Sequence, residues 1–164
     1  MAFLRLKTDN PGYRVRHLDN PSNAIKESRE ELIRWSWKQW TKWIAVFPKQ
    51  VSNLTTVDIA FDPNSTSKTS YIGNPITQAA VTIGPLEYNS SESTLKYALV
   101  HELGHVLGLP ANHFHARWTK AVMSKNRSGI SEPQAPDVIQ LWKRYPPSEF
   151  ATKTVMFKDV PQPE

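Results

Sequence analysis

The chain has 164 residues and a formal net charge of +5, and its 39% hydrophobic residues and six Trp suit one compact domain with a buried core. This composition excludes a disordered, collagen-like or coiled-coil protein, and the scattered basic residues favour a solvated surface over an acidic partner such as nucleic acid. The absence of Cys excludes a disulfide framework, a thiolate zinc site and a cysteine nucleophile, so any metal must be held by His, Asp or Glu.

The first predicted elements are a strand and a long helix. Residues 13–18 predict a short strand, which ends at a turn cluster beginning with Asp19. An amphipathic helix follows over residues 22–47, where apolar residues recur at steps of mostly three and four, and Pro48 ends it. Because aromatic residues at helical spacing are more often core than a ligand platform, we expect its four Trp to be buried.

The middle of the chain predicts three strands and a second helix. Residues 57–61 alternate between apolar and polar side chains, which is the period of a strand with one buried face. Residues 65–70 indicate a polar loop, and residues 71–75 and 79–83 predict a pair of strands. A hydroxyl-rich segment at residues 90–93 then offers caps for a helix that continues to Leu107.

The last part of the chain predicts one more helix. After a loop over residues 110–132, Pro136 begins this helix at a first-turn position. We expect a tail of unknown role over residues 148–164, with one possible strand at residues 154–157. No apolar run approaches the roughly 20 residues of a membrane span, and no signal peptide is recognisable. We therefore expect a soluble chain without a membrane partner, and its location stays open between the cytoplasm and an exported form.

The motif His101-Glu102-Leu103-Gly104-His105 carries the chemistry. Two histidines four positions apart project from the same face of a helix and can bind one ion. Glu102 lies beside the first of them, where a carboxylate can take a proton from a metal-bound water and pass it to the leaving amine. The motif thus predicts one catalytic zinc ion, held by His101 and His105, with Glu102 as the general base.

Gly108 follows the second histidine by three residues, where a left-handed helix cap would turn the chain back toward the metal. A third ligand could then come from the loop. His113 and His115 both lie within reach, and we expect His113 because a nearer residue requires less loop ordering, with His115 as the alternative. The remaining histidine, His17, lies far away in the sequence, so no second zinc is predicted.

The stretches HELGHVLGL and Ala121-Val122-Met123-Ser124 resemble the metzincin zinc proteases, whose pattern HExxHxxGxxH is followed by a Met in a tight turn beneath the metal. Over residues 13–145 the order of elements is similar to the compact matrixin and snapalysin branches. The resemblance implies an α+β, metzincin-like zincin with a small mixed twisted sheet, a long N-terminal helix, an HExxH active-site helix and a C-terminal helix. It places the catalytic domain at residues 1–147 and gives Met123 a structural role.

The resemblance also implies an endopeptidase that binds a peptide or protein substrate in extended form along an edge strand, which we place at residues 79–83. The family's third ligand would fall on Ala111, which cannot bind zinc, and this departure leaves His113 and His115 as candidates. Matrixins usually place that ligand eight residues before their Met, and this spacing points to His115. Tyr145 could stabilise an oxyanion, but its place on an apolar helix face favours core packing.

Two other functions compete with a zinc endopeptidase. If neither loop histidine reaches the metal, the chain is a catalytically degenerate zinc- or peptide-binding protein, although such a protein has no need of Glu102 as a base. A basic metal-dependent RNA hydrolase fits the net charge, but such enzymes lack a Glu at the second motif position, and no aromatic-basic patch for RNA is visible. We therefore expect peptide hydrolysis, without a nucleic-acid partner, and leave the oligomeric state open.

Overall fold

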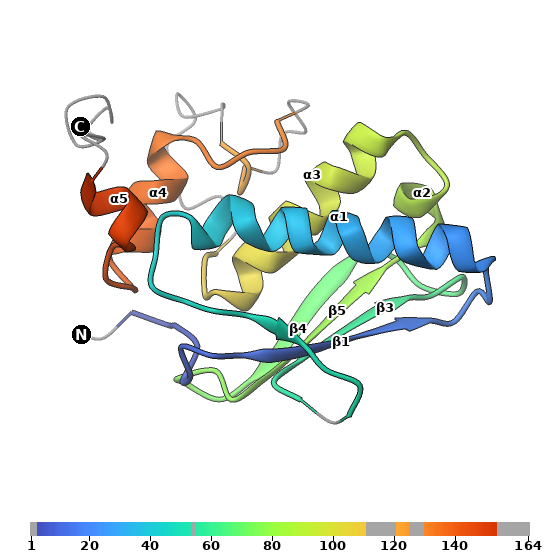
Figure 1. Ribbon diagram of the computed structural model, residues 1–164, viewed down its shortest axis with the longest axis horizontal. Helices are drawn as coiled ribbons and strands as arrows, with labels where there is room; N and C mark the ends of the chain where they lie inside the picture. The colour runs from blue at the N-terminus through green and yellow to red at the C-terminus, as the bar shows by residue number, and fades with distance from the viewer. Residues whose placement is uncertain (1–2, 54, 111–120, 125–129, 154–164) are drawn as a thin grey trace.

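The computed structural model describes residues 3–53, 55–110, 121–124 and 130–153. A single mixed sheet lies under a layer of helices, and Figure 1 shows α1 (Asn23–Thr41) and α3 (Glu92–Val106) crossing the same face of that sheet. The strands are β1 (Gly12–His17), β2 (Lys49–Gln50), β3 (Val57–Phe61), β4 (Lys68–Ile72) and β5 (Gln78–Ile83). Their order in the sheet is β2-β1-β3-β5-β4, and β4 is antiparallel to β5 while the other neighbours are parallel. The expected small mixed sheet is confirmed.

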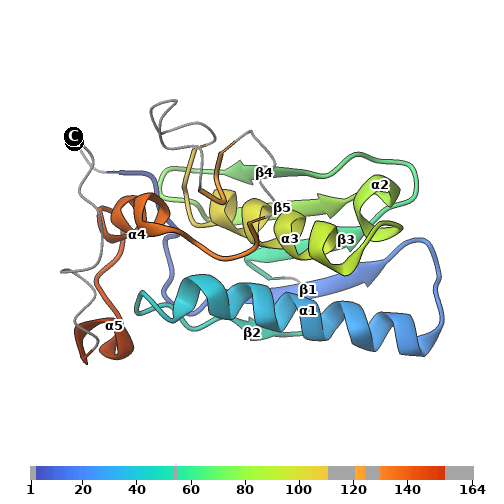
Figure 2. The same ribbon diagram turned by 90° about the horizontal axis from the view of Figure 1, so that it is seen from above.

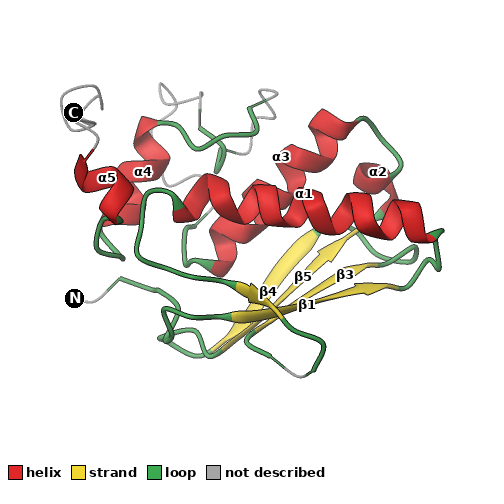
Figure 3. Ribbon diagram, in the orientation of Figure 1, coloured by secondary structure: helices red, strands yellow, loops and turns green. Residues whose placement is uncertain are grey.

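The helices lie on one side of the sheet, as the red elements in Figure 3 show. They are α1 (Asn23–Thr41), α2 (Pro85–Tyr88), α3 (Glu92–Val106), α4 (Ala135–Trp142) and α5 (Glu149–Lys153). Seen from above, α1 and α3 run side by side over the sheet and α4 and α5 lie beyond one end of it (Figure 2). Within the described part of the chain, no helix is long and apolar enough to cross a membrane.

Helix α1 begins where the sequence predicts and ends six residues earlier than expected. Ser22 caps its first turn by accepting a hydrogen bond from the backbone N–H of Ile25 at 3.4 Å. The helix ends at Thr41, and the chain then continues irregularly and buries Trp43 and Ile44. The predicted end at Phe47 is therefore wrong, because apolar residues in this irregular segment continue a spacing that looked helical.

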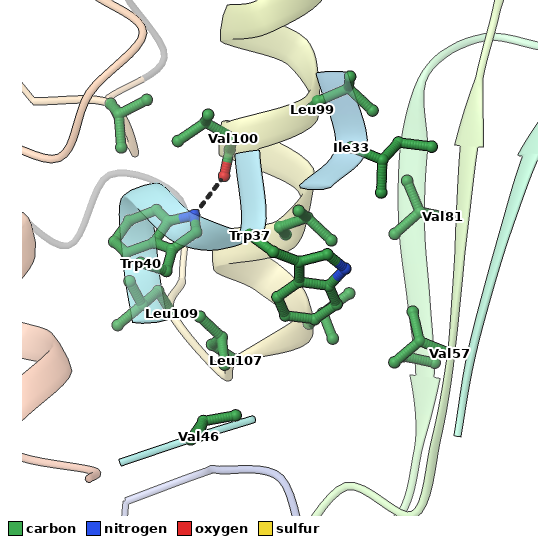
Figure 4. Close-up of a cluster of buried hydrophobic side chains, with 14 of the residues drawn as sticks. Ile33, Trp37, Trp40, Val46, Val57, Val81, Leu99, Val100, Leu107 and Leu109 are labelled. Atoms are coloured by element: carbon green, nitrogen blue, oxygen red, sulfur yellow. Dashed lines mark hydrogen bonds between the residues drawn. The ribbon is translucent and has the colours of Figure 1, made fainter. Parts of the chain in front are cut away.

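Tryptophans of α1 fill the space between the helix layer and the sheet, as expected from their spacing. Trp37 and Trp40 are buried among aliphatic side chains from α3 and the strands (Figure 4). The indole N–H of Trp40 donates a hydrogen bond of 2.8 Å to the carbonyl oxygen of Val100, which ties α1 to α3. Trp43 is also buried and Trp35 is half-buried, so the core interpretation is confirmed for three of the four.

The strand pair after β3 differs from the prediction in its bounds and in its place in the sheet. Strand β4 begins at Lys68, inside the segment predicted to be a polar loop, because most of its residues are exposed and give no apolar signal. Strand β5 is paired on both sides, with β3 and with β4. The expected edge strand at residues 79–83 is therefore wrong, and the edge on this side of the sheet is β4.

The C-terminal elements pack against the irregular segment that follows α1. Helix α4 starts with a Pro in its first turn, as predicted, and its face with Val138 and Leu141 is buried. The short helix α5 was not predicted; the Phe150 ring lies 5.6 Å from that of Trp43. Ser148 also donates its backbone N–H to the Trp43 carbonyl at 3.0 Å. The possible strand at residues 154–157 lies outside the described residues.

Candidate metal centre

Helix α3 carries both motif histidines near its C-terminal end. Its first turn is capped by Ser91, whose hydroxyl accepts a hydrogen bond from the Thr94 backbone N–H. Helical geometry then places His101 and His105 one turn apart, with their ring centroids separated by 4.8 Å. Both imidazoles are half-buried, while the neighbouring Glu102 is 8% exposed. The helix therefore pairs the two imidazoles, with Glu102 next to His101 in the chain.

Each imidazole is oriented by a backbone carbonyl. The Nδ1 atom of His101 lies 2.7 Å from the oxygen of Val122, and the Nδ1 atom of His105 lies 2.8 Å from the oxygen of Leu109. A carbonyl oxygen only accepts hydrogen bonds, so both Nδ1 atoms carry the proton. This pattern is typical of metal-binding histidines, because it leaves the lone pair on Nε2.

The two Nε2 atoms face each other at 3.2 Å. Two lone pairs directed at the same small space repel each other unless a cation or a proton lies between them, and this arrangement fits a metal ion such as zinc. Among the described residues, no group of three or more His, Asp or Glu side chains comes together as a complete metal site. His113 and His115, the expected sources of a third ligand, lie outside the described residues.

Gly108 ends α3 with the left-handed backbone that the sequence predicts. Its φ is +99°, and the Leu109 backbone N–H donates to the carbonyl of Gly104 at 3.0 Å, which reverses the chain. A side chain at Gly108 would overlap the backbone carbonyl of Leu4, so this turn is also packed closely against the N-terminal segment. The same turn brings the Leu109 carbonyl to His105.

Glu102 contacts the edge strand of the sheet. The Thr69 hydroxyl on β4 donates a hydrogen bond of 2.7 Å to the Glu102 Oε1 atom, and it also lies 3.2 Å from that residue's backbone carbonyl. Thr69 was not predicted as a site residue, since it falls in the segment expected to be a polar loop. No local signal could have found it, because only the placement of β4 beside α3 brings Thr69 to Glu102.

Residues 121–124 form a turn that packs against α3. The Ser124 backbone N–H donates to the Ala121 carbonyl at 3.2 Å, and Met123 is fully buried. The Met123 side chain lies beside Gly104. In the sequence, Gly104 is one of the three residues that separate the two motif histidines. The structure thus brings Met123 to the predicted site from a distant part of the sequence, next to the carbonyl of Val122 that orients His101.

Asp137 on α4 holds this turn from the other side. Its carboxylate accepts hydrogen bonds from the backbone N–H groups of Val122 at 2.9 Å and Met123 at 3.2 Å, and from that of Gln134 at 2.8 Å. Burial raises the pKa of Asp137 to about 6, against its ordinary value of 3.8. Sequence reasoning missed this residue, although an acid in the first turn of a predicted helix is a typical capping signal.

Two other residues considered from the sequence, Tyr145 and His17, lie outside the pair of motif histidines. The Tyr145 hydroxyl donates to the Leu107 carbonyl at 2.7 Å and accepts from the Leu6 backbone N–H at 2.8 Å, and burial raises its pKa to about 12. Tyr145 is therefore a core residue, as expected. His17 lies at the end of β1, where its Nε2 atom is 3.4 Å from a carboxylate oxygen of Glu30, so it belongs to a different polar cluster.

Comparisons with known proteins identify the fold. No family model matches this chain, and no curated protein matches it in sequence. Two solved structures of myroilysin superpose on it, the first with a TM-score of 0.63 and 14% sequence identity over 87% of this chain and 86% of that one. The second gives a TM-score of 0.58 and 13% identity over 84% and 92%. The chain shares its fold with myroilysin. It therefore has an α+β fold of the same kind.

Proposed function

We propose that this protein is a zinc-dependent endopeptidase of the metzincin type. The observation that carries the proposal is the pair of Nε2 atoms of His101 and His105, 3.2 Å apart, with both Nδ1 atoms directed at backbone carbonyls. This is the donor arrangement that zinc requires from two histidines on one helix. The fold shared with myroilysin and the turn around Met123 support the same conclusion.

Zinc, when bound, supplies Lewis-acid polarisation of a peptide carbonyl and lowers the pKa of a bound water. His101 and His105 would hold it, together with His113 or His115 as the third ligand. Glu102 takes the proton of the attacking water on its carboxylate and returns it to the leaving amine, which requires a base close to the metal and shielded from bulk water. Its exposure of only 8% supports the shielding, and its place directly after His101 in the motif supports the proximity.

Strand β4 is the natural platform for an extended substrate. It lies at the sheet edge next to the motif helix and is the strand from which Thr69 reaches Glu102. A peptide can add itself to such an edge through backbone hydrogen bonds, so that the bond to be cut lies over the base. The substrate class that follows from this geometry is an unfolded or flexible segment of a peptide or protein.

Metal content and peptide cleavage, measured on the same sample of purified protein, test this proposal. We expect about one zinc per chain, cleavage of casein or a peptide library, loss of cleavage on chelation and recovery when zinc is returned. Zinc binding without cleavage would favour a non-catalytic peptide-binding protein. Salt-sensitive retention or cleavage of RNA would favour the RNA hydrolase. A chain that binds no zinc would contradict the proposal outright.

A further inference from the structure

We propose that Thr69 is a positioning residue that fixes the carboxylate of Glu102 from the substrate-binding edge strand. The inference rests on the proposed zinc endopeptidase function. It adds to that function a residue that lies outside the HExxH motif, 33 positions earlier in the chain. No sequence motif contains it, and only the pairing of β4 beside α3 brings it to the base.

The distances show which atom receives the hydroxyl proton. A threonine hydroxyl carries one hydrogen, and its two neighbours are Glu102 Oε1 at 2.7 Å and the Glu102 backbone oxygen at 3.2 Å. The shorter contact has the length of a strong O–H···O bond, and a charged acceptor is preferred over a neutral one. The hydroxyl therefore donates to the carboxylate.

This bond gives the two carboxylate oxygens different roles. Oε1 is held toward β4, which leaves Oε2 as the atom that receives the proton from water. Glutamate has several rotatable bonds and loses much rotamer freedom when it is held in one orientation. A general base must lie within hydrogen-bond reach of the proton that it takes, so a fixed Oε1 keeps Oε2 in the productive position.

Thr69 is well suited to this role by its place in the strand. Side chains of a strand alternate between faces, so Thr69 points toward α3 while its neighbour Ser70 lies on the opposite, open face. Threonine is β-branched, which restricts its χ1 angle and holds the hydroxyl in place. Because β4 is the edge on which we place the substrate, the same strand would align the peptide and orient the base.

The test compares three variants with the wild-type protein. Thr69→Val keeps the β-branched shape and removes the hydroxyl, Thr69→Ser keeps the hydroxyl, and Thr82→Val makes the same change on the inner strand β5, away from the proposed substrate edge. We expect Thr69→Val to lower kcat about tenfold or more, with KM within about twofold and zinc content unchanged. Thr69→Ser should restore most of the loss, and Thr82→Val should match the wild type.

Crystal structures of the metal-free variants give a readout that does not depend on activity. We expect the Glu102 carboxylate to keep one orientation in the wild-type and Thr69→Ser proteins and to leave it in Thr69→Val. An unchanged kcat in Thr69→Val, or an equal loss in Thr69→Ser, would overturn the positioning role. If the wild-type protein cleaves no peptide, the proposed function fails. The Thr69 assignment is tested separately by the crystal structures, and a Glu102 carboxylate that does not move in metal-free Thr69→Val would overturn it.

Discussion

Met123 occupies the space that a side chain at Gly104 would need. A Cβ atom at Gly104 would overlap the Met123 sulfur and would also lie 2.9 Å from the Trp40 ring. The glycine between the two motif histidines is therefore required by packing, because α3, α1 and the turn at residues 121–124 meet at this point. The contact fixes the position of the turn whose Val122 carbonyl orients His101.

Gly104→Ala should consequently destabilise the protein. We expect the free energy of unfolding to fall by about 1–3 kcal/mol from overpacking, reduced by up to about 1 kcal/mol because Ala is the better helix former. Urea denaturation measures this change. The control is a double-mutant cycle with Met123→Ala, which removes the clashing sulfur: the double variant should be more stable than the sum of the two single effects predicts. Strict additivity would contradict the packing argument.

Glu102→Gln tests the base directly. The amide has the shape of the carboxylate and cannot accept the proton of the attacking water, so we expect a loss of at least ~100-fold in kcat. The zinc content should stay near that of the wild type, since Glu102 is not a predicted ligand. Peptide cleavage and zinc analysis of the same preparation measure both quantities. Near-normal turnover in this variant would exclude Glu102 as the base.

The pH dependence of stability should report the buried carboxylate of Asp137. The folded protein keeps this proton up to a pKa of about 6, whereas the unfolded chain releases it near the ordinary value of 3.8. The folded state thus binds more protons between these values, and the contribution of Asp137 to stability is lost as the pH rises through 6. From pH 4 to pH 7 this loss should amount to about 2 kcal/mol.

Asp137→Asn isolates this effect, because Asn does not titrate. Urea denaturation of both proteins from pH 4 to pH 7 should show the stability of the wild type falling relative to that of the variant. At every pH the variant also loses acceptors for the N–H groups of Val122 and Met123, which lowers its stability by a constant amount. A wild-type advantage that grows with pH would show that the carboxylate is ionised well below pH 6.

The sequence predicted the elements that have one buried face and repeated apolar residues. Strand β3 and the amphipathic helix α4 follow their periodicity, whereas α3 is buried on most sides and was delimited by its hydroxyl caps and by Gly108. The left-handed turn at Gly108 was predictable because few other residues adopt that backbone. The motif histidines followed from helical spacing alone.

The features that the sequence could not give depend on tertiary contacts. Strand β4 is an exposed edge, so its residues carry no alternating pattern, and its start at Lys68 was missed. The place of β5 inside the sheet could not be predicted, because an edge strand with one buried face shows the same alternation. Thr69 and Asp137 reach the site through contacts with residues 33 and 15 positions away, which no local pattern records.

The third zinc ligand remains a prediction, and the shorter loop favours His113 over His115. After Gly108 reverses the chain, the described residues continue to Pro110, and Leu109 is held by its hydrogen bonds to Gly104 and His105. His113 follows that fixed point after four residues and His115 after six. Both distances can be spanned, so the cost of ordering the loop decides, and it is smaller for the nearer residue.

His113→Ala should therefore lower zinc affinity by ~100-fold or more and abolish peptide cleavage, whereas His115→Ala should keep its zinc and change activity only modestly. Each variant is dialysed against a chelator of known affinity, and the zinc that remains is measured beside the wild-type protein. His17→Ala serves as the matched control, because it removes an imidazole from a separate cluster and should retain the metal. Loss of zinc from the His115 variant alone would transfer the ligand role to that residue. Retention in both single variants and loss in the double variant would mean that either histidine can complete the site.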